Sequence, residues 1–131
     1  MSVAAADKRL VQERSGGRCE YCRMLNVWEP FFTYHVEHII ARQHGGSDRP
    51  DNLCLACHHC NLLKGPNLTS IDPDGGGVTP LFNPRTHAWV EHFRSDAGSV
   101  FGLTAIGRTT VFLLQMNAAQ RVELRLENPG A

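Results

Sequence analysis

The 131-residue sequence predicts an α+β fold in which short strands and short helices surround a cysteine-rich segment. Two observations support this prediction. Segment 31–40 is rich in β-branched and aromatic residues and is followed after a polar loop by a short second strand at 53–56, whereas segment 3–14 is rich in helix-forming residues and segment 57–64 is predicted to be a helix closed by glycine. All five cysteines fall within the first 60 residues, and the last 71 residues contain none. The chain therefore divides chemically into a cysteine-containing part and a C-terminal part.

The overall composition is that of an ordinary globular chain, with 42% hydrophobic and 20% charged residues. Thirteen Lys and Arg residues balance thirteen Asp and Glu residues, so a nucleic-acid partner would have to bind through a local basic patch with salt-sensitive affinity. No apolar run approaches the ~18 residues of a membrane span, and the N-terminus lacks the pattern of a signal peptide. We therefore expect a cytoplasmic chain with reduced thiols and no membrane partner.

The C-terminal part is predicted to contain a linker and an extension. Residues 67–79 are assigned to the linker, because Asp72-Pro73-Asp74 and three consecutive glycines allow little regular structure. Residues 80–131 are assigned to an extension that packs on the core. Its expected elements are a hairpin of strands 89–93 and 100–103, a helix from the cap Thr104 to Met116, and a last helix over 118–127 capped by Asn117, for which a strand is the alternative.

Two Cys-x-x-Cys pairs predict a structural zinc site. Cys19 and Cys22 form the first pair and Cys57 and Cys60 the second, separated by 34 residues. Each pair turns tightly enough for both thiolates to reach one ion, and two pairs complete the tetrahedral four-cysteine shell typical of structural zinc. Cys54 also stands three residues before Cys57 and is an alternative ligand; we prefer it as a buried strand thiol.

A second constellation lies between and beside the cysteine pairs. It comprises Glu37-His38-Ile39-Ile40, the turn Gly45-Gly46-Ser47, Asn52-Leu53, and Asn61 followed by Lys64-Gly65. In this order and spacing, with fourteen positions from His38 to Asn52 and nine from Asn52 to Asn61, the chain resembles the zinc-bearing HNH endonucleases over about residues 14–66. Segments 81–85, 89–93 and 102–108 resemble the C-terminal extension of a bacterial subgroup of that family.

The resemblance implies a ββα-metal core, also called a His-Me finger, over residues 1–66, and a metal-dependent DNA endonuclease activity. It implies that His38 is the general base, held at its other ring nitrogen by a backbone carbonyl of the following loop. Glu37 and Asn61 would hold a catalytic Mg²⁺ or Mn²⁺ ion, with Ni²⁺ or Zn²⁺ as alternatives, and Asn52 would maintain the loop. The competing interpretation is a catalytically inactive, zinc-dependent module that binds nucleic acid.

Several assignments have more ordinary alternatives. His35 shares a strand face with Glu37 and is either a further metal or phosphate ligand or a hydrogen-bonded strand histidine. His59 ranks below Asn61 as a metal ligand. Arg42, Arg49 and Lys64 flank the motif and are the candidate phosphate contacts to DNA, expected to be double-stranded. Arg9, Arg14, Arg18 and Arg23 are further candidates, and the oligomeric state is not predicted.

Overall fold

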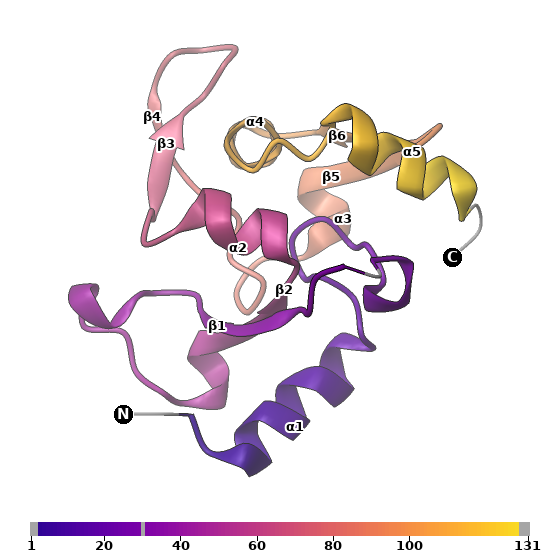
Figure 1. Cartoon of the computed structure of the whole chain (residues 1–131). Helices are drawn as coiled ribbons and strands as arrows, with labels where there is room; N and C mark the ends of the chain where they lie inside the picture. Colours follow the sequence, from indigo (N-terminus) through magenta and orange to yellow (C-terminus); the bar gives the residue numbers. More distant parts are fainter. Residues whose placement is uncertain (1–2, 30, 129–131) are drawn as a thin grey trace. The chain divides into compact units, whose positions relative to one another are not determined.

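The computed structural model describes residues 3–29 and 31–128 and divides the chain into two compact units, Met1–Leu62 and Leu63–Ala131 (Figure 1). Helices alternate with three antiparallel two-stranded sheets, which confirms the α+β class. No helix of the described ranges is both long and apolar enough to cross a bilayer.

The first unit is built on a single hairpin. Strand β1, His35–His38, pairs in antiparallel register with β2, Leu53–Ala56, so that His35 lies opposite Ala56 and His38 opposite Leu53. Helix α1, Ala5–Ser15, packs against β2 and buries Val11 completely. The connection between the strands contains two 3₁₀ turns, η2 (Arg42–His44) and η3 (Pro50–Asn52), and a third, η1 (Asn26–Trp28), precedes β1.

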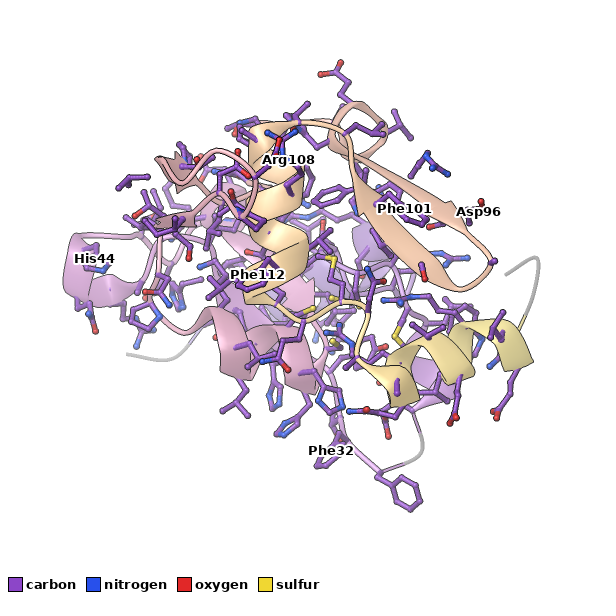
Figure 2. The ribbon with its side chains drawn as sticks, turned by 90° about the horizontal axis from the view of Figure 1, so that it is seen from above. Phe32, His44, Asp96, Phe101, Arg108 and Phe112 are labelled. Carbon is purple, nitrogen blue, oxygen red and sulfur yellow. The ribbon has the colours of Figure 1, made fainter. Side chains whose placement is uncertain are left out.

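Strand β1 is shorter than the predicted segment 31–40. Its partner β2 has only four residues, because η3 ends directly before it and a cysteine of the second pair follows directly after it. Residues beyond the partner have no strand to pair with, however high their β propensity. Phe31 and Phe32 therefore lie outside the sheet, and Phe32 projects from the loop before β1 with 43% of its surface exposed (Figure 2).

Helix α2, His58–Lys64, follows β2 after one residue and returns along the hairpin in the direction of β1 (Figure 1). The chain turns at the end of the hairpin where Ala56 faces His35, and the His35 and His58 rings lie there with their centroids 6.3 Å apart. The ring of Phe32 stacks on that of His58 at 4.1 Å. The start of α2 is thus fixed beside the start of β1.

The second unit begins with regular structure where the sequence predicts a linker. Strands β3 (Thr69–Ile71) and β4 (Val78–Pro80) form a hairpin within residues 67–80, so the expectation of an irregular linker at 67–79 is wrong. The proline and glycine residues form its turn, and Asp72 closes it: its carboxylate accepts a hydrogen bond from Asp74 N and a bidentate pair from Arg108 at 2.9 and 3.2 Å. Arg108 lies 36 residues after Asp72, so the sequence around Asp72 does not reveal this partner.

The rest of the second unit contains the predicted hairpin and two helices with shifted boundaries. Its elements are α3 (Trp89–His92), β5 (Phe93–Asp96), β6 (Ser99–Gly102), α4 (Ala105–Leu113) and α5 (Ala119–Glu127). Thr104 caps α4 as predicted, by accepting a hydrogen bond from Gly107 N. The predicted strand over 89–93 is mostly the helical turn α3, and only Phe93 joins the sheet.

The packing of α4 and α5 corrects three further expectations. The apolar residues of the predicted helix form a stripe that includes Phe112, but Phe112 is 67% exposed and points outward (Figure 2), whereas Thr109 and Thr110 are buried. Asn117 does not cap α5; its side chain bonds both backbone groups of Val100. The strand alternative for the last segment is excluded. Buried Arg121 of α5 donates to the carbonyl oxygens of Leu114 and Gln115, which the end of α4 leaves without helical partners.

Candidate active site and zinc cluster

The structure brings four cysteines together in the first unit. The ligand atoms of Cys19, Cys22, Cys57 and Cys60 all lie within 4.8 Å of one another, and all four residues are buried. Within the described part of the chain this is the only group of three or more His, Cys, Asp or Glu residues that close together. The cluster has the composition and compactness of a structural zinc site.

The local geometry of each pair suits thiolate ligands. Cys22 N lies 3.5 Å from Cys19 Sγ, and Cys60 N lies 3.4 Å from Cys57 Sγ, so a backbone amide of each turn points at the first sulfur of its own pair. Such hydrogen bonds stabilise negative charge on sulfur. Burial raises the pKa of the Cys19 and Cys60 thiols, because the interior disfavours the thiolate. A divalent cation among the four sulfurs would offset that cost and release protons on binding.

Cys54 lies outside the cluster. It is fully buried in β2, where its thiol lies 3.8 Å from the Tyr21 hydroxyl. Burial raises the pKa of Tyr21 well above its usual value, so the neighbour of Cys54 is a neutral phenol rather than a charge. The structure thus places Cys54 as a buried strand thiol and leaves Cys57 as the third member of the cluster.

Glu37 lies on β1 and Asn61 on α2, two elements that start beside each other. Glu37 is two residues beyond His35 on β1, and Asn61 is three residues beyond His58 on α2, starting from the ends where these two histidine rings approach each other. Two strand residues advance about 6.6 Å and three helical residues about 4.5 Å. Since α2 returns in the direction of β1 (Figure 1), the backbone positions of both residues are displaced in the same direction from the histidine contact.

Both oxygen-bearing groups are free to accept a ligand. Neither the Glu37 carboxylate nor the Asn61 amide forms a hydrogen bond or ion pair with another residue of the described chain. The His35 ring lies near the His58 ring. Within the described residues, His35 and Glu37 do not belong to a group of three potential metal ligands. His59 packs edge-on against Phe32 and His58, which turns its ring toward the aromatic cluster.

His38, the last residue of β1, is held by a carboxylate. Its Nε2 lies 2.7 Å from Oδ1 of Asp48, and the same oxygen accepts a hydrogen bond from Arg42 Nε at 3.0 Å. The resemblance implied a backbone carbonyl for this contact; the structure has a side chain instead. The hydrogen bonds from His38 and Arg42 hold the pKa of the Asp48 carboxyl below its usual value, so it is ionised at neutral pH.

The loop that carries Asp48 is fixed by Asn52. The Asn52 amide accepts a hydrogen bond from Ile40 N at 2.9 Å and donates to Ile40 O at 3.0 Å and to Ser47 O at 2.8 Å. Gly46 makes this closure possible, because a Cβ there would lie 1.7 Å from Ile40 O. These contacts support the role in loop shape that the resemblance implies for Asn52.

The basic candidates for phosphate contact separate into two groups. Arg42 and Arg49 are exposed, and Arg42 lines an open cavity of about 280 Å³ together with Gly46, Ser47 and Asp48. Lys64 is 6% exposed and engaged with other groups, so it does not present its ammonium to a ligand here. Arg14 is also engaged: one terminal nitrogen donates to the carbonyl oxygens of Pro50 and Leu53 and ties α1 to the hairpin.

Asp48 is the site residue that the sequence analysis missed. The only signal was its position directly after Gly45-Gly46-Ser47, and aspartate in such a turn is usually a turn former. Its contact with His38 spans ten residues and depends on the folded loop. No pattern of local spacing therefore distinguishes this carboxylate from the exposed carboxylate of Asp51 three residues on.

The candidate zinc cluster lies in the same unit as a hairpin and a helix that carry His, Glu and Asn. In a comparison with family models, residues 19–67, a little over a third of the chain, match the HNH endonuclease family. This part of the chain is thus similar to a domain of nucleases, which points to a nuclease or nucleic-acid-binding function. No curated protein and no solved structure gave a significant match. The likeness of segments after residue 80 to a bacterial subgroup stays a prediction.

Proposed function

We propose that this protein is a metal-dependent DNA endonuclease in which His38 is the general base. The observation that carries the proposal is the 2.7 Å contact between His38 Nε2 and the ionised Asp48 carboxylate. A carboxylate only accepts hydrogen bonds, so the neutral form of the His38 imidazole has its proton on Nε2 and its lone pair on Nδ1. The His38 side chain is 17% exposed, and the residue before it is Glu37, whose carboxylate has no partner within the described residues. A base and a metal-binding carboxylate thus occupy neighbouring positions at the end of one strand.

The chain's own residues supply the proton transfer. His38 Nδ1 accepts the proton of an attacking water as the water oxygen forms a new bond to phosphorus and a bridging P–O bond of the phosphodiester breaks, and the leaving oxygen takes a proton from solvent to become a hydroxyl. Asp48 stabilises the imidazolium that results. Arg42 and Arg49 are exposed cations next to this site and bind backbone phosphates of DNA.

The catalytic divalent cation is assigned to Glu37 and Asn61. A carboxylate and an amide carbonyl are hard oxygen ligands suited to Mg²⁺ or Mn²⁺, and both are unpaired within the described ranges. Such an ion, when bound, neutralises phosphate charge and polarises the P–O bonds. His35 shares the strand face of Glu37, and the centroid of its ring lies 6.3 Å from that of the His58 ring.

A plasmid-nicking assay with zinc-loaded protein and added Mg²⁺ or Mn²⁺ tests the proposal. We expect cleavage by the wild type and a loss of about 10²–10⁴-fold in rate for His38→Ala, with zinc content unchanged. His44→Ala is the matched control, because His44 is an exposed histidine at the outer end of the same loop (Figure 2). DNA binding without any cleavage by the wild type would instead identify a catalytically inactive nucleic-acid-binding module.

A further inference from the structure

A single carboxylate oxygen joins the candidate base to the candidate phosphate anchor. Oδ1 of Asp48 lies 2.7 Å from His38 Nε2 and 3.0 Å from Arg42 Nε. Nε is the inner nitrogen of the guanidinium, so this contact leaves the two terminal nitrogens of Arg42 for another acceptor. Within the described residues, Asp48 is the only ion-pair partner of Arg42.

Arg42 lines an open cavity that offers hydrogen-bond donors to a phosphate. The cavity is lined by Arg42, Gly46, Ser47 and Asp48, so it presents a guanidinium and a hydroxyl beside a carboxylate that is already paired with Arg42. A guanidinium binds a phosphate through two parallel N–H donors, so the edge of the guanidinium that carries them must face the phosphate. The bond from Nε to Asp48 sets that orientation.

The position of Asp48 is itself determined by the loop. The two residues before it are constrained: Gly46 lies against Ile40 O, and Ser47 O accepts a hydrogen bond from Asn52. The Asp48 side chain is 29% exposed, compared with 73% for Asp51 on the same loop. Asp48 therefore differs from the carboxylate of an ordinary exposed ion pair, because the loop restrains it and its Oδ1 accepts from both His38 Nε2 at 2.7 Å and Arg42 Nε at 3.0 Å.

We propose that Asp48 is a positioning residue that holds His38 with its proton on Nε2 and at the same time directs the terminal nitrogens of Arg42 at the substrate phosphate. The inference rests on the proposed endonuclease function and adds the residue that aligns its base with its phosphate anchor. One carboxylate then sets both the direction of proton transfer and the place of the phosphate, and neither alignment depends on the metal ligands.

The first test is spectroscopic and needs no activity. In zinc-loaded protein with ¹⁵N-labelled histidine, the ring nitrogen shifts of neutral His38 should show the proton on Nε2; His38→Gln identifies the signals. Asp48→Asn replaces an obligate acceptor by an amide that also donates, so a population with the proton on Nδ1 should appear. Asp51→Asn, the matched control, should leave the His38 signals unchanged.

The second test divides the two effects of Asp48. Asp48→Asn should lower kcat by about 10²–10⁴-fold, as expected when the base has the wrong tautomer. Arg42→Gln should keep the tautomer, raise KM and reduce the salt dependence of DNA binding by about one phosphate contact. Asp48→Glu restores the acceptor and should recover the Nε2 tautomer and part of kcat.

Two outcomes separate this inference from the function on which it rests. If His38→Ala is inactive but Asp48→Asn keeps both the wild-type tautomer and the wild-type kcat, Asp48 is not a positioning residue and the endonuclease proposal stands. If His38→Ala cleaves DNA as the wild type does, the proposed base is wrong and the inference is overturned with it. Should Asp48→Asn fail to retain zinc, Asp48→Ala, which removes the acceptor altogether, carries the same comparison.

Discussion

Replacing Asn52 by alanine tests how the loop between the strands of the hairpin is held in shape. The substitution removes three hydrogen bonds, those to Ile40 N, Ile40 O and Ser47 O. Each contributes about 1 kcal/mol net to the free energy of unfolding. Ser47 is exposed and Ile40 is 38% exposed, so water replaces part of what is lost. We therefore expect a destabilisation of about 2–3 kcal/mol.

The measurement is urea unfolding of zinc-saturated protein, followed by far-UV circular dichroism and analysed by linear extrapolation. Asn26→Ala is the control, because Asn26 is an exposed asparagine of the same unit and its side chain has no hydrogen bond within the described ranges; it should change the free energy of unfolding by less than about 0.5 kcal/mol.

Asn52→Asp adds a second, sharper comparison. It keeps the acceptor for Ile40 N but turns a carboxylate toward the carbonyl oxygens of Ile40 and Ser47, so it should destabilise at least as much as alanine. If the free energy of unfolding of Asn52→Ala lies within about 0.5 kcal/mol of the wild-type value, the three hydrogen bonds do not hold the loop. The loop would then not restrain Asp48 either.

Three further predictions concern the metals and the second unit. Metal analysis should find one equivalent of zinc per chain. Cys54→Ser should retain this zinc and Cys57→Ser should lose it. The reverse result would make Cys54 the ligand in place of Cys57. Glu37→Ala should raise the Mg²⁺ concentration for half-maximal cleavage by more than about tenfold, and Asn61→Ala by less, because only the first removes a charge; equal dependence in Asn61→Ala and wild type would exclude Asn61 from the site. Hydrogen bonds from Arg108 lower the pKa of the Asp72 carboxyl below its ordinary value of 3.8. The stability that these bonds give is therefore present above pH 3.8 and is lost as the pH falls through the lower pKa of the folded state. The difference in unfolding midpoint between wild type and Asp72→Asn should therefore disappear on acidification below about pH 4, and a constant difference would contradict this linkage.

Features that depend on neighbouring residues could be predicted from the sequence. The zinc cluster follows from two Cys-x-x-Cys turns, each of which brings its thiols together by local geometry, and the structure adds only the approach of the pairs. Strand β2 at Leu53–Ala56 was predicted with its observed bounds, and α2 within one residue, because a glycine ends the helix and a polar loop precedes the strand. The Thr104 cap is likewise a local signal.

Features that depend on partners far along the chain needed the tertiary structure. The length of β1 is set by its partner strand, the hairpin in the predicted linker is closed by Arg108, and Phe112 faces outward because α4 buries its threonine face. The contact of Asp48 with His38 belongs to the same class. Residue types and spacing identified the candidate groups for the proposed hydrolysis, whereas the closed loop decided which carboxylate faces His38, since a hydrogen bond between side chains ten residues apart exists only after the backbone between them has folded.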